Sequence, residues 1–455
     1  MKRILLVAVL FGVFALLSGC KKFLSKRADA IQETPSTAAA YQALLDNDLV
    51  TLKATPALGA LGADDYILDS TALQTTPPGQ IGLYSWNPMG YAGSTDASWV
   101  NPYEAIYQCN VVIHGLELVP HKEPTDWALY KLVRSRALFA RAFHFFMLEE
   151  TYGQPYRPLF AAMDLGIPLR LDGDALQPVV RFSVKSVFDQ IIADLKIALP
   201  DLPPAPQPGV PNRPSRSGAF ALLARAALVQ QDYTAARGYA DSSLALYSTL
   251  LNYDTITNNA RPFDYTNNPE LLYQCSGFVY PSLYSSTTIV DTTLYKSYAI
   301  DDRRRDLFFQ KLTSGKGVSF KGYYSVGHFV FSGLAVDEIY LIRAECRARL
   351  QDDAGALTDL NRLLSSRWKT GAYVPYASSF SGILGLVLTE RRKEMVYREM
   401  RWSDLRRLNL DPHLAITLKR TMGGASVVLP PNDPRYAWKI PTVETDLSHI
   451  QQNPD

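Results

Sequence analysis

The side chains that most often carry enzyme chemistry form no recognisable constellation in this sequence. Its six histidines show no HExxH or other metal-ligand spacing, and neither a GxSxG motif nor a phosphate-binding loop occurs. Glu149 and Glu150 are adjacent near the expected end of a helix, so we expect them to point to different faces and into solvent. The sequence therefore predicts no catalytic residue, no metal and no cofactor. A glycoside hydrolase stays open as an alternative, because its two carboxylates leave little sequence trace.

A second group of reactive side chains is the charged block over residues 390–407. Carboxylates and arginines recur three or four positions apart there, a spacing that brings opposite charges together on a helix. We interpret the block as a structural ion-pair network around Trp402, because long arginine side chains pack readily on aromatic rings and carboxylates. We do not expect it to bind a ligand.

Three stretches of helical periodicity must position any site, and they predict a mostly α-helical fold. Apolar residues recur at helical spacing over residues 127–152, which indicates one long helix. Residues 217–246 and 336–364 each indicate two helices joined by a short polar turn, close to the length of a tetratricopeptide repeat, which is about 34 residues. The proline-rich residues 199–214 indicate a surface crossover. Because the repeats are degenerate and far apart, we expect a tetratricopeptide-like scaffold with long irregular loop insertions, not a regular solenoid.

Two of these insertions stand out, over residues 52–101 and 247–328. The first is rich in glycine, proline, threonine and aromatic residues, and the second in asparagine, serine, threonine and tyrosine. Neither has the periodicity of a helix. Binding residues usually sit in loops on a rigid scaffold, so we expect these insertions to carry the function.

The N-terminus is typical of an exported lipoprotein. Two basic residues precede an apolar run over residues 4–17, which is too short to span a bilayer comfortably. Small residues then lead to Cys20 at a cleavage position. We therefore expect a signal peptide over residues 1–19 and a lipid anchor on Cys20 that holds the protein to a membrane. An ordinary secretory signal with an incidental cysteine is the alternative.

The composition of the remaining body excludes several classes of protein. Lys2 and Arg3 leave with the signal, so the formal charge of +2 falls to zero and no basic stripe suggests nucleic acid. No second apolar stretch is long enough for a transmembrane helix. Besides Cys20, the cysteines are Cys109, Cys275 and Cys346, without CxxC spacing, which argues against a zinc site and a disulfide framework. We expect buried thiols, and a single bridge stays open.

Six short motifs follow one another along the chain. They are CKKFL at residues 20–24, Trp99 with Tyr103, Ile106, Tyr107 and Asn110, RALFARAF at 136–143 continuing to Tyr152-Gly153, the helix over 338–345, ERRKE at 390–394 with RWSDLRR at 401–407, and Ile440-Pro441 with Gln452-Asn453-Pro454. Each motif is modest alone. Together and in this order they resemble the SusD/RagB family of outer-membrane nutrient-binding lipoproteins of Bacteroidota.

The resemblance implies a non-catalytic protein that caps a SusC-type TonB-dependent transporter and delivers an oligosaccharide, or in some members a peptide. It implies one nutrient-binding domain over residues 20–455, with an N-terminal part to about residue 199 and a C-terminal part from about residue 215. It also implies a lipid-anchored place on the outer membrane. Outward display stays open, because Lys21-Lys22 lacks the acidic run that often marks surface export. A scaffold or lid without a ligand of its own is the alternative.

A neutral polyol presents flat apolar faces and many hydroxyls, so a receptor for it needs exposed aromatic rings with polar groups nearby. The two insertions provide both. The candidate ligand contacts are Asp64, Asp65, Tyr66, Tyr84, Trp86, Asn87, Tyr280, Tyr284 and Tyr324. Trp86 is the best single candidate. We expect Trp99 to lie in the core, because it belongs to the motif at the start of a helix.

Overall fold

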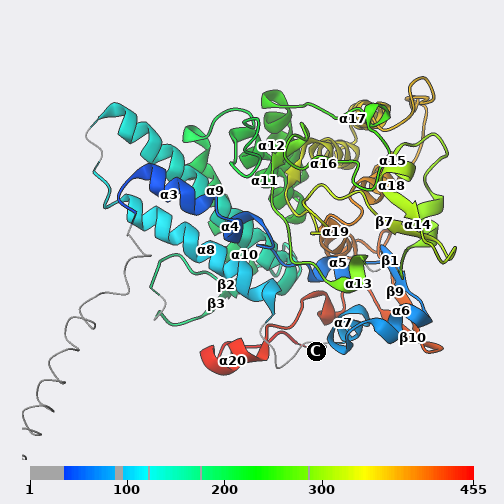
Figure 1. The fold of residues 1–455 in the computed structure, drawn as a ribbon, viewed down its shortest axis with the longest axis horizontal. Coiled ribbons are helices and arrows are strands. Elements are labelled where there is room, and N and C mark those ends of the chain that lie inside the picture. The colour runs from blue at the N-terminus through cyan, green and yellow to red at the C-terminus, as the bar shows by residue number, and fades with distance from the viewer. Residues whose placement is uncertain (1–34, 88–95, 121–122, 175–176, 285–286, 455) are drawn as a thin grey trace, which may run out of the picture.

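A computed structural model describes residues 35–87, 96–120, 123–174, 177–284 and 287–454, and helices dominate it as predicted (Figure 1). The signal peptide and Cys20 lie outside the described residues. The first helical group packs around one long helix on the left of Figure 1. It comprises α3 (Ala38–Leu45), α4 (Asp48–Thr51), α8 (Ala97–Leu116), α9 (Pro124–Tyr152) and α10 (Val184–Ala198). The helix α9 confirms the long helix predicted over residues 127–152.

The two predicted helical hairpins are also confirmed. They are α11 (Arg216–Val229) with α12 (Tyr233–Leu246), and α16 (Val336–Arg349) with α17 (Asp353–Ser365). Each turn has the same construction: a glutamine with positive φ, Gln231 or Gln351, precedes an aspartate that caps the returning helix. The helix α12 packs against α16, so the hairpins are neighbours although they are far apart in sequence. The stretch between α10 and α11 is irregular apart from a short 3₁₀ turn, Leu199–Asp201.

The sequence pattern did not show the short helices of the two insertions, nor the short strand pairs, which lie both inside and outside the insertions. The helices are α5 (Leu58–Gly62), α6 (Ser70–Thr75), α7 (Pro78–Tyr84), α13 (Pro281–Tyr284), α14 (Thr292–Lys296) and α15 (Arg304–Leu307). The antiparallel strand pairs are β1 (Tyr66–Leu68) with β5 (Thr288–Val290), β2 (Leu165–Pro168) with β3 (Arg181–Ser183), β4 (Leu271–Tyr273) with β8 (Leu334–Ala335), β6 (Phe309–Lys311) with β7 (Val318–Phe320), and β9 (Leu418–Met422) with β10 (Ala425–Leu429). The β1–β5 pair joins one insertion to the other.

The charged block forms α18 (Ile383–Glu394) and α19 (Met400–Leu408), and it is a buried ion-pair network as predicted. The network includes Arg304–Glu390 at 2.6 Å, Arg367–Glu394 at 2.8 Å, Arg391–Asp404 at 2.8 Å, Arg398–Asp337 at 2.6 Å and Arg407–Glu345 at 2.6 Å. Beside it, Trp402 packs on the rings of Tyr436 and Trp438. Removing one partner of such a desolvated pair costs several times what an exposed pair contributes, because the other charge is left buried and unpaired.

The prediction that Glu149 and Glu150 face solvent is wrong, because both carboxyl groups are buried. The two residues do point to different faces, but both faces are covered. Glu149 accepts a hydrogen bond from the backbone N–H of Ile167 in β2 at 3.0 Å, and Glu150 accepts one from the Ser403 hydroxyl in α19. Burial raises the pKa of Glu149 to about 8.

Cys109, Cys275 and Cys346 are buried free thiols, as predicted. In the ranges that the structure describes, no helix has both the length and the apolar character needed to cross a bilayer. Within the same ranges, no cluster of three or more histidine, cysteine, aspartate or glutamate side chains is placed to hold a metal ion.

Candidate functional site

Three of the predicted ligand contacts surround an arginine of the same chain. The guanidinium carbon of Arg420, in β9, lies 3.8 Å from the ring centroid of Tyr84, 4.6 Å from that of Trp86 and 5.4 Å from that of Tyr66. We call this group the Arg420 cage. The Arg420 guanidinium also donates to the carbonyls of Leu61 at 3.1 Å and Gly62 at 3.2 Å. The cation therefore takes the ring faces that we expected a ligand to use.

The exposure predicted for Trp86 is wrong. Its side chain is only 1% exposed, and its indole N–H donates to the Gly62 carbonyl at 2.9 Å. A cavity that touches Trp86 holds about 10 Å³, roughly the space of one water molecule. Tyr66 and Tyr84 are buried as well. None of the three rings is accessible enough to serve as a sugar platform, because the chain itself covers them.

The two acidic candidates beside the cage belong to the ion-pair network. Asp64 forms bonds with Arg401 at 2.6 Å and with Arg392 at 3.0 Å. Burial favours the neutral acid, but the two arginines outweigh it and lower the pKa of Asp64. Asp65 is buried, and burial together with the charge of Asp64 raises the pKa of Asp65 to about 6.

The predicted tyrosines of the second insertion divide into structural and exposed residues. Tyr280 is buried, and its hydroxyl donates to Asp96, the residue that caps the N-terminus of α8, at 3.0 Å. Tyr324 is buried and donates to Glu270 at 2.8 Å. Tyr284 is 38% exposed and stacks on His328 at 4.9 Å. Asn87 is also exposed, so Tyr284 and Asn87 are the two candidates with the access that contact with a ligand requires.

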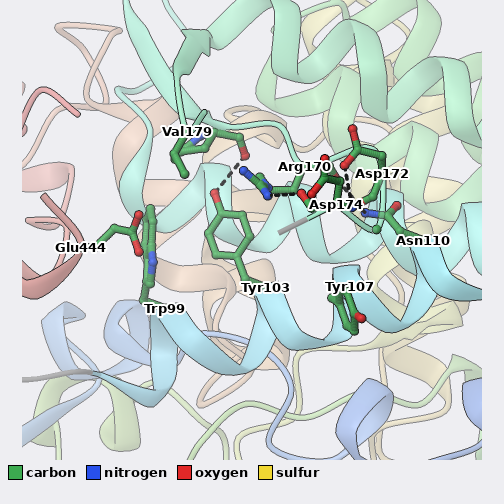
Figure 2. Close-up of a pocket in the computed structure, with 11 residues that line it drawn as sticks. Trp99, Tyr103, Tyr107, Asn110, Arg170, Asp172, Asp174, Val179 and Glu444 are labelled. Atoms are coloured by element: carbon green, nitrogen blue, oxygen red, sulfur yellow. Dashed lines mark hydrogen bonds between the residues drawn. The ribbon is translucent and has the colours of Figure 1, made fainter. Parts of the chain in front are cut away.

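A different part of the molecule presents an accessible aromatic pocket, which we call the α8 pocket (Figure 2). It holds about 230 Å³. It is formed by α8, by residues 168–174 with Val179, which we call the Arg170 loop, and by α20 (Thr442–Ser448). Its lining residues are Trp99, Tyr103, Tyr107, Asn110, Pro168, Arg170, Asp172, Gly173, Asp174, Val179 and Glu444. None of them was among the predicted contacts.

The helix α8 supplies the rings of this pocket. Trp99, Tyr103 and Tyr107 are four residues apart, so they lie on one face of the helix. Trp99 is buried against Tyr152, as predicted for a core residue, yet it also lines the pocket beside Glu444 (Figure 2). Tyr103 donates to the Pro168 carbonyl at 2.9 Å, and Tyr107 is 47% exposed. The exposure of the three rings therefore increases along the helix, from the buried Trp99 to the exposed Tyr107.

Buried polar side chains hold the opposite wall in place. Asn110 donates to the carbonyls of Arg170 at 2.9 Å and Asp172 at 3.0 Å. Arg141 donates to the side-chain oxygen of Asn110 at 2.9 Å and pairs with Asp194 at 2.8 Å. Arg170 itself donates to the Asp174 carbonyl at 2.7 Å. Fixed polar groups of this kind give a loop a defined shape before a ligand arrives.

The α8 pocket is acidic. Asp172, Asp174 and Glu444 line it against the single cation of Arg170. Burial, and then the charges of Glu444 and Glu149, raise the pKa of Tyr103 well above its ordinary value, so the phenol remains a neutral hydrogen-bond donor. The pocket therefore combines ring faces with acceptors for hydroxyl or ammonium groups and disfavours anions.

The sequence carried one signal for this pocket, the spacing of the three rings. That spacing is equally typical of a helix face that packs into a core. The face is partly open because residues 168–174, Val179 and α20 border it without filling it, and all of them lie far from α8 in sequence.

Comparison with known proteins agrees with this architecture. Residues 22–228 match a family described as SusD-like, starch-binding associating with outer membrane, and residues 337–446 match the SusD family. The chain belongs to the SusD/RagB family. No curated protein is similar enough to count as a match.

Solved SusD-like structures share the fold over nearly the whole chain. A SusD superfamily protein from Bacteroides thetaiotaomicron has a TM-score of 0.73 at 21% identity, covering 92% of this chain and 100% of its own. A putative sugar binding protein from Bacteroides vulgatus has a TM-score of 0.74 at 20% identity, covering 93% and 99%. A SusD-like carbohydrate binding protein from the same species has a TM-score of 0.66 at 17% identity, covering 91% and 97%. The predicted SusD-like scaffold is thus confirmed.

Proposed function

We propose that this SusD-family protein captures a glycan at the surface of the outer membrane and delivers it to a SusC-type TonB-dependent transporter. In this proposal, lipid on Cys20 anchors the mature chain and the protein has no catalytic role. Two kinds of observation support the assignment. The family description names starch binding at the outer membrane, and two structural neighbours are titled as sugar-binding or carbohydrate-binding proteins.

The observation that carries the proposal is the α8 pocket. Sugar rings have flat C–H faces that pack on aromatic side chains, and hydroxyls that donate to carboxylates. Tyr103 and Tyr107 offer ring faces at the pocket, and Asp172 and Glu444 offer acceptors. A volume of about 230 Å³ lies below the roughly 300–1,000 Å³ of drug-sized sites. We infer that the pocket takes one sugar unit of a longer glycan, while the rest of the glycan extends into solvent.

The test is a calorimetric titration of the mature chain, from Lys21 onward, with neutral plant, fungal and host oligosaccharides and with mixed peptides. We expect binding to a neutral glycan. Replacing Tyr107 with alanine should weaken that binding at least about tenfold, which corresponds to ~1.4 kcal/mol. Because Tyr107 is 47% exposed, the melting temperature should hardly change.

The matched control is Trp127→Ala on the neighbouring helix α9, another exposed ring, which lies outside the pocket lining. It should leave affinity unchanged. Equal affinities for wild type and Tyr107→Ala would remove the α8 pocket from the proposal. If the wild type bound none of the glycans, the alternative of a lid without its own ligand would be favoured. New reducing ends in the mixtures would reveal a hydrolase.

A further inference from the structure

A second cavity has the opposite electrostatic character. It holds about 210 Å³, lies in the second insertion, and shares no lining residue with the α8 pocket. Arg261, Lys321 and Tyr323 line it, together with Asp264 and the ring of Tyr265. We call it the Lys321 cavity.

Lys321 is the main anomaly in this cavity. Its side chain is buried, yet within the described residues its ammonium group has no carboxylate within ion-pair distance. It donates to the Asn259 carbonyl at 2.9 Å and to the side-chain oxygen of Asn258, both neutral acceptors. The charge of Asp306 acts on Lys321 from beyond ion-pair distance, and Asp306 is itself paired with Arg303 at 3.1 Å. A buried cation without a counter-charge is costly, so a ligand that supplies the missing charge would be bound favourably there.

The other polar groups of the cavity agree with an incoming anion. Arg261 is exposed, and in the part of the chain that the structure describes its guanidinium has no ion-pair partner. The hydroxyl of Tyr323 is buried, the residue being 8% exposed, and it has no hydrogen-bond partner among the described atoms. An unsatisfied buried hydroxyl destabilises the free protein, so an acceptor oxygen on a ligand would relieve that cost.

The one carboxylate on the wall is already occupied. Asp264 accepts from the backbone N–H of Thr266 at 2.8 Å and from the side-chain amide of Asn267 at 3.0 Å, which turns it toward its own loop. The lining thus carries two cations, Arg261 and Lys321, and one carboxylate, Asp264. Its net charge of +1 would be balanced by a single carboxylate on a ligand.

Aromatic rings border the same cavity. Tyr265, which lines it, is 40% exposed. Phe263 and Tyr323 also line it, and outside the lining His328 packs on Tyr323 with ring centroids 5.3 Å apart. Ring faces beside a cationic cavity suit a sugar that carries an acidic group better than a bare inorganic anion.

We propose that the Lys321 cavity binds the carboxylate of a uronic acid unit in a glycan. Arg261 and Lys321 receive the carboxylate, the Tyr323 hydroxyl donates to it, and Tyr265 packs on the sugar ring. The assignment goes beyond the proposed function, because it adds a second site with the opposite charge preference. It does not require the α8 pocket to bind anything.

The test is calorimetry of the mature chain with galacturonate, glucuronate and mannuronate trimers at fixed ionic strength. Each trimer is compared with its methyl ester, which has the same skeleton without the charge. We expect at least one free acid to bind about tenfold or more tightly than its ester, with affinity that falls as salt rises. Arg261→Gln and Lys321→Met should each abolish that preference.

Tyr323→Phe gives the sharpest variant, because it deletes only a hydroxyl without a protein partner. If the hydroxyl had no part in binding, its loss would leave uronate affinity unchanged, and the loss of an unsatisfied buried group would at most raise stability slightly. We expect instead a severalfold loss of uronate affinity without a fall in melting temperature. Arg362→Gln, an exposed arginine on α17, is the matched control and should bind as wild type does.

Three results would overturn the assignment. They are equal affinity for every acid and its ester, unchanged preference in Arg261→Gln, and acetylated dipeptides with a free carboxylate binding as tightly as the uronates, which would indicate a peptide carboxylate site. The two sites fail separately: Tyr107→Ala should keep uronate binding, and Lys321→Met should keep binding of neutral glycans.

Discussion

The Arg420 cage and the α8 pocket are built from the same kinds of side chain and differ in what occupies them. Each gathers three aromatic rings from the N-terminal third of the chain. In the cage, Arg420 arrives from β9 and fills the space between the rings. In the α8 pocket, the Arg170 loop and α20 stand beside the rings and leave about 230 Å³ open. Ring composition alone therefore does not distinguish a ligand platform from a structural cage.

The difference also assigns a role to each arginine. Arg420 uses its donors on backbone carbonyls between the rings, so it satisfies groups that would otherwise be buried without partners. Arg170 uses its donors on the carbonyls of its own loop, which leaves the centre of the pocket free. A guanidinium can thus close one aromatic site and shape another.

The largest effect that separates the two regions is expected from Trp86→Ala. The ring is 1% exposed, and removing it leaves a cavity in the core and takes away one of the two donors, the Trp86 indole and Arg420, that the Gly62 carbonyl has. Large-to-small substitutions of buried aromatic residues cost about 3–5 kcal/mol. We expect a loss of that size in urea unfolding, while the folded fraction keeps wild-type affinity for a glycan.

Tyr107→Ala is the counterpart of that variant, with lost affinity and retained stability. A Trp86→Ala protein that is as stable as wild type but binds glycan tenfold more weakly would reverse the roles of the two regions.

Arg420→Lys should give a smaller loss of stability. Lysine keeps the charge, but its compact ammonium group cannot bridge the carbonyls of Leu61 and Gly62 while it lies between the rings. We expect unfolding to become easier by about 1.5–3 kcal/mol, measured by urea denaturation. Lys419→Ala, the exposed neighbour in β9, is the control and should be silent. If Arg420→Lys were as stable as wild type, the cage would not depend on the several N–H donors of the guanidinium group.

An effect that appears only as the pH rises is expected from Glu149→Gln, whose buried side chain accepts a hydrogen bond from Ile167 in β2. Burial raises the pKa of Glu149 from 4.5 to about 8. Between these values the folded state binds more protons than the unfolded state, so this group's contribution to stability is present at low pH and lost as the pH rises. The amide cannot ionise, so the stability of the variant relative to wild type should rise as the pH rises above 4.5, by about 1.4 kcal/mol for each pH unit between the two pKa values.

Thermal melts of both proteins from pH 4.5 to 8.5 measure this difference. Glu104→Gln, an exposed glutamate on α8, should melt as wild type does at every pH. Parallel pH profiles for Glu149→Gln and wild type would show that the buried carboxyl does not titrate in this range.

Much of the scaffold was predictable because its signals are local. Helical periodicity predicted α9 and both hairpins. The charges of residues 390–407 predicted a structural ion-pair network, but most of its pairs join distant segments, such as Arg407 with Glu345, and not residues three or four apart. The short strands and helices of the insertions were not predicted, because elements of a few residues have no period to detect. Their pairing, such as β1 with β5, joins distant segments.

The candidate site was harder to predict for the same reason. Nothing near Trp86 in the sequence shows that Arg420 will cover it, and nothing near Tyr107 shows that α20 will leave it accessible. Glu149 was misplaced because two adjacent carboxylates at a helix end usually face water, whereas β2 and α19 cover them here. Exposure is a property of the assembled chain, and it decides which rings can meet a ligand.

The most direct test of the central claim is a crystal structure of the mature chain with the neutral oligosaccharide that binds it most tightly. We predict density for one sugar unit in the α8 pocket, packed on Tyr107 and Tyr103 with hydroxyls on Glu444 or Asp172, and an unchanged Arg420 cage. Density for the sugar between Trp86 and Tyr84, with Arg420 displaced, would contradict the account.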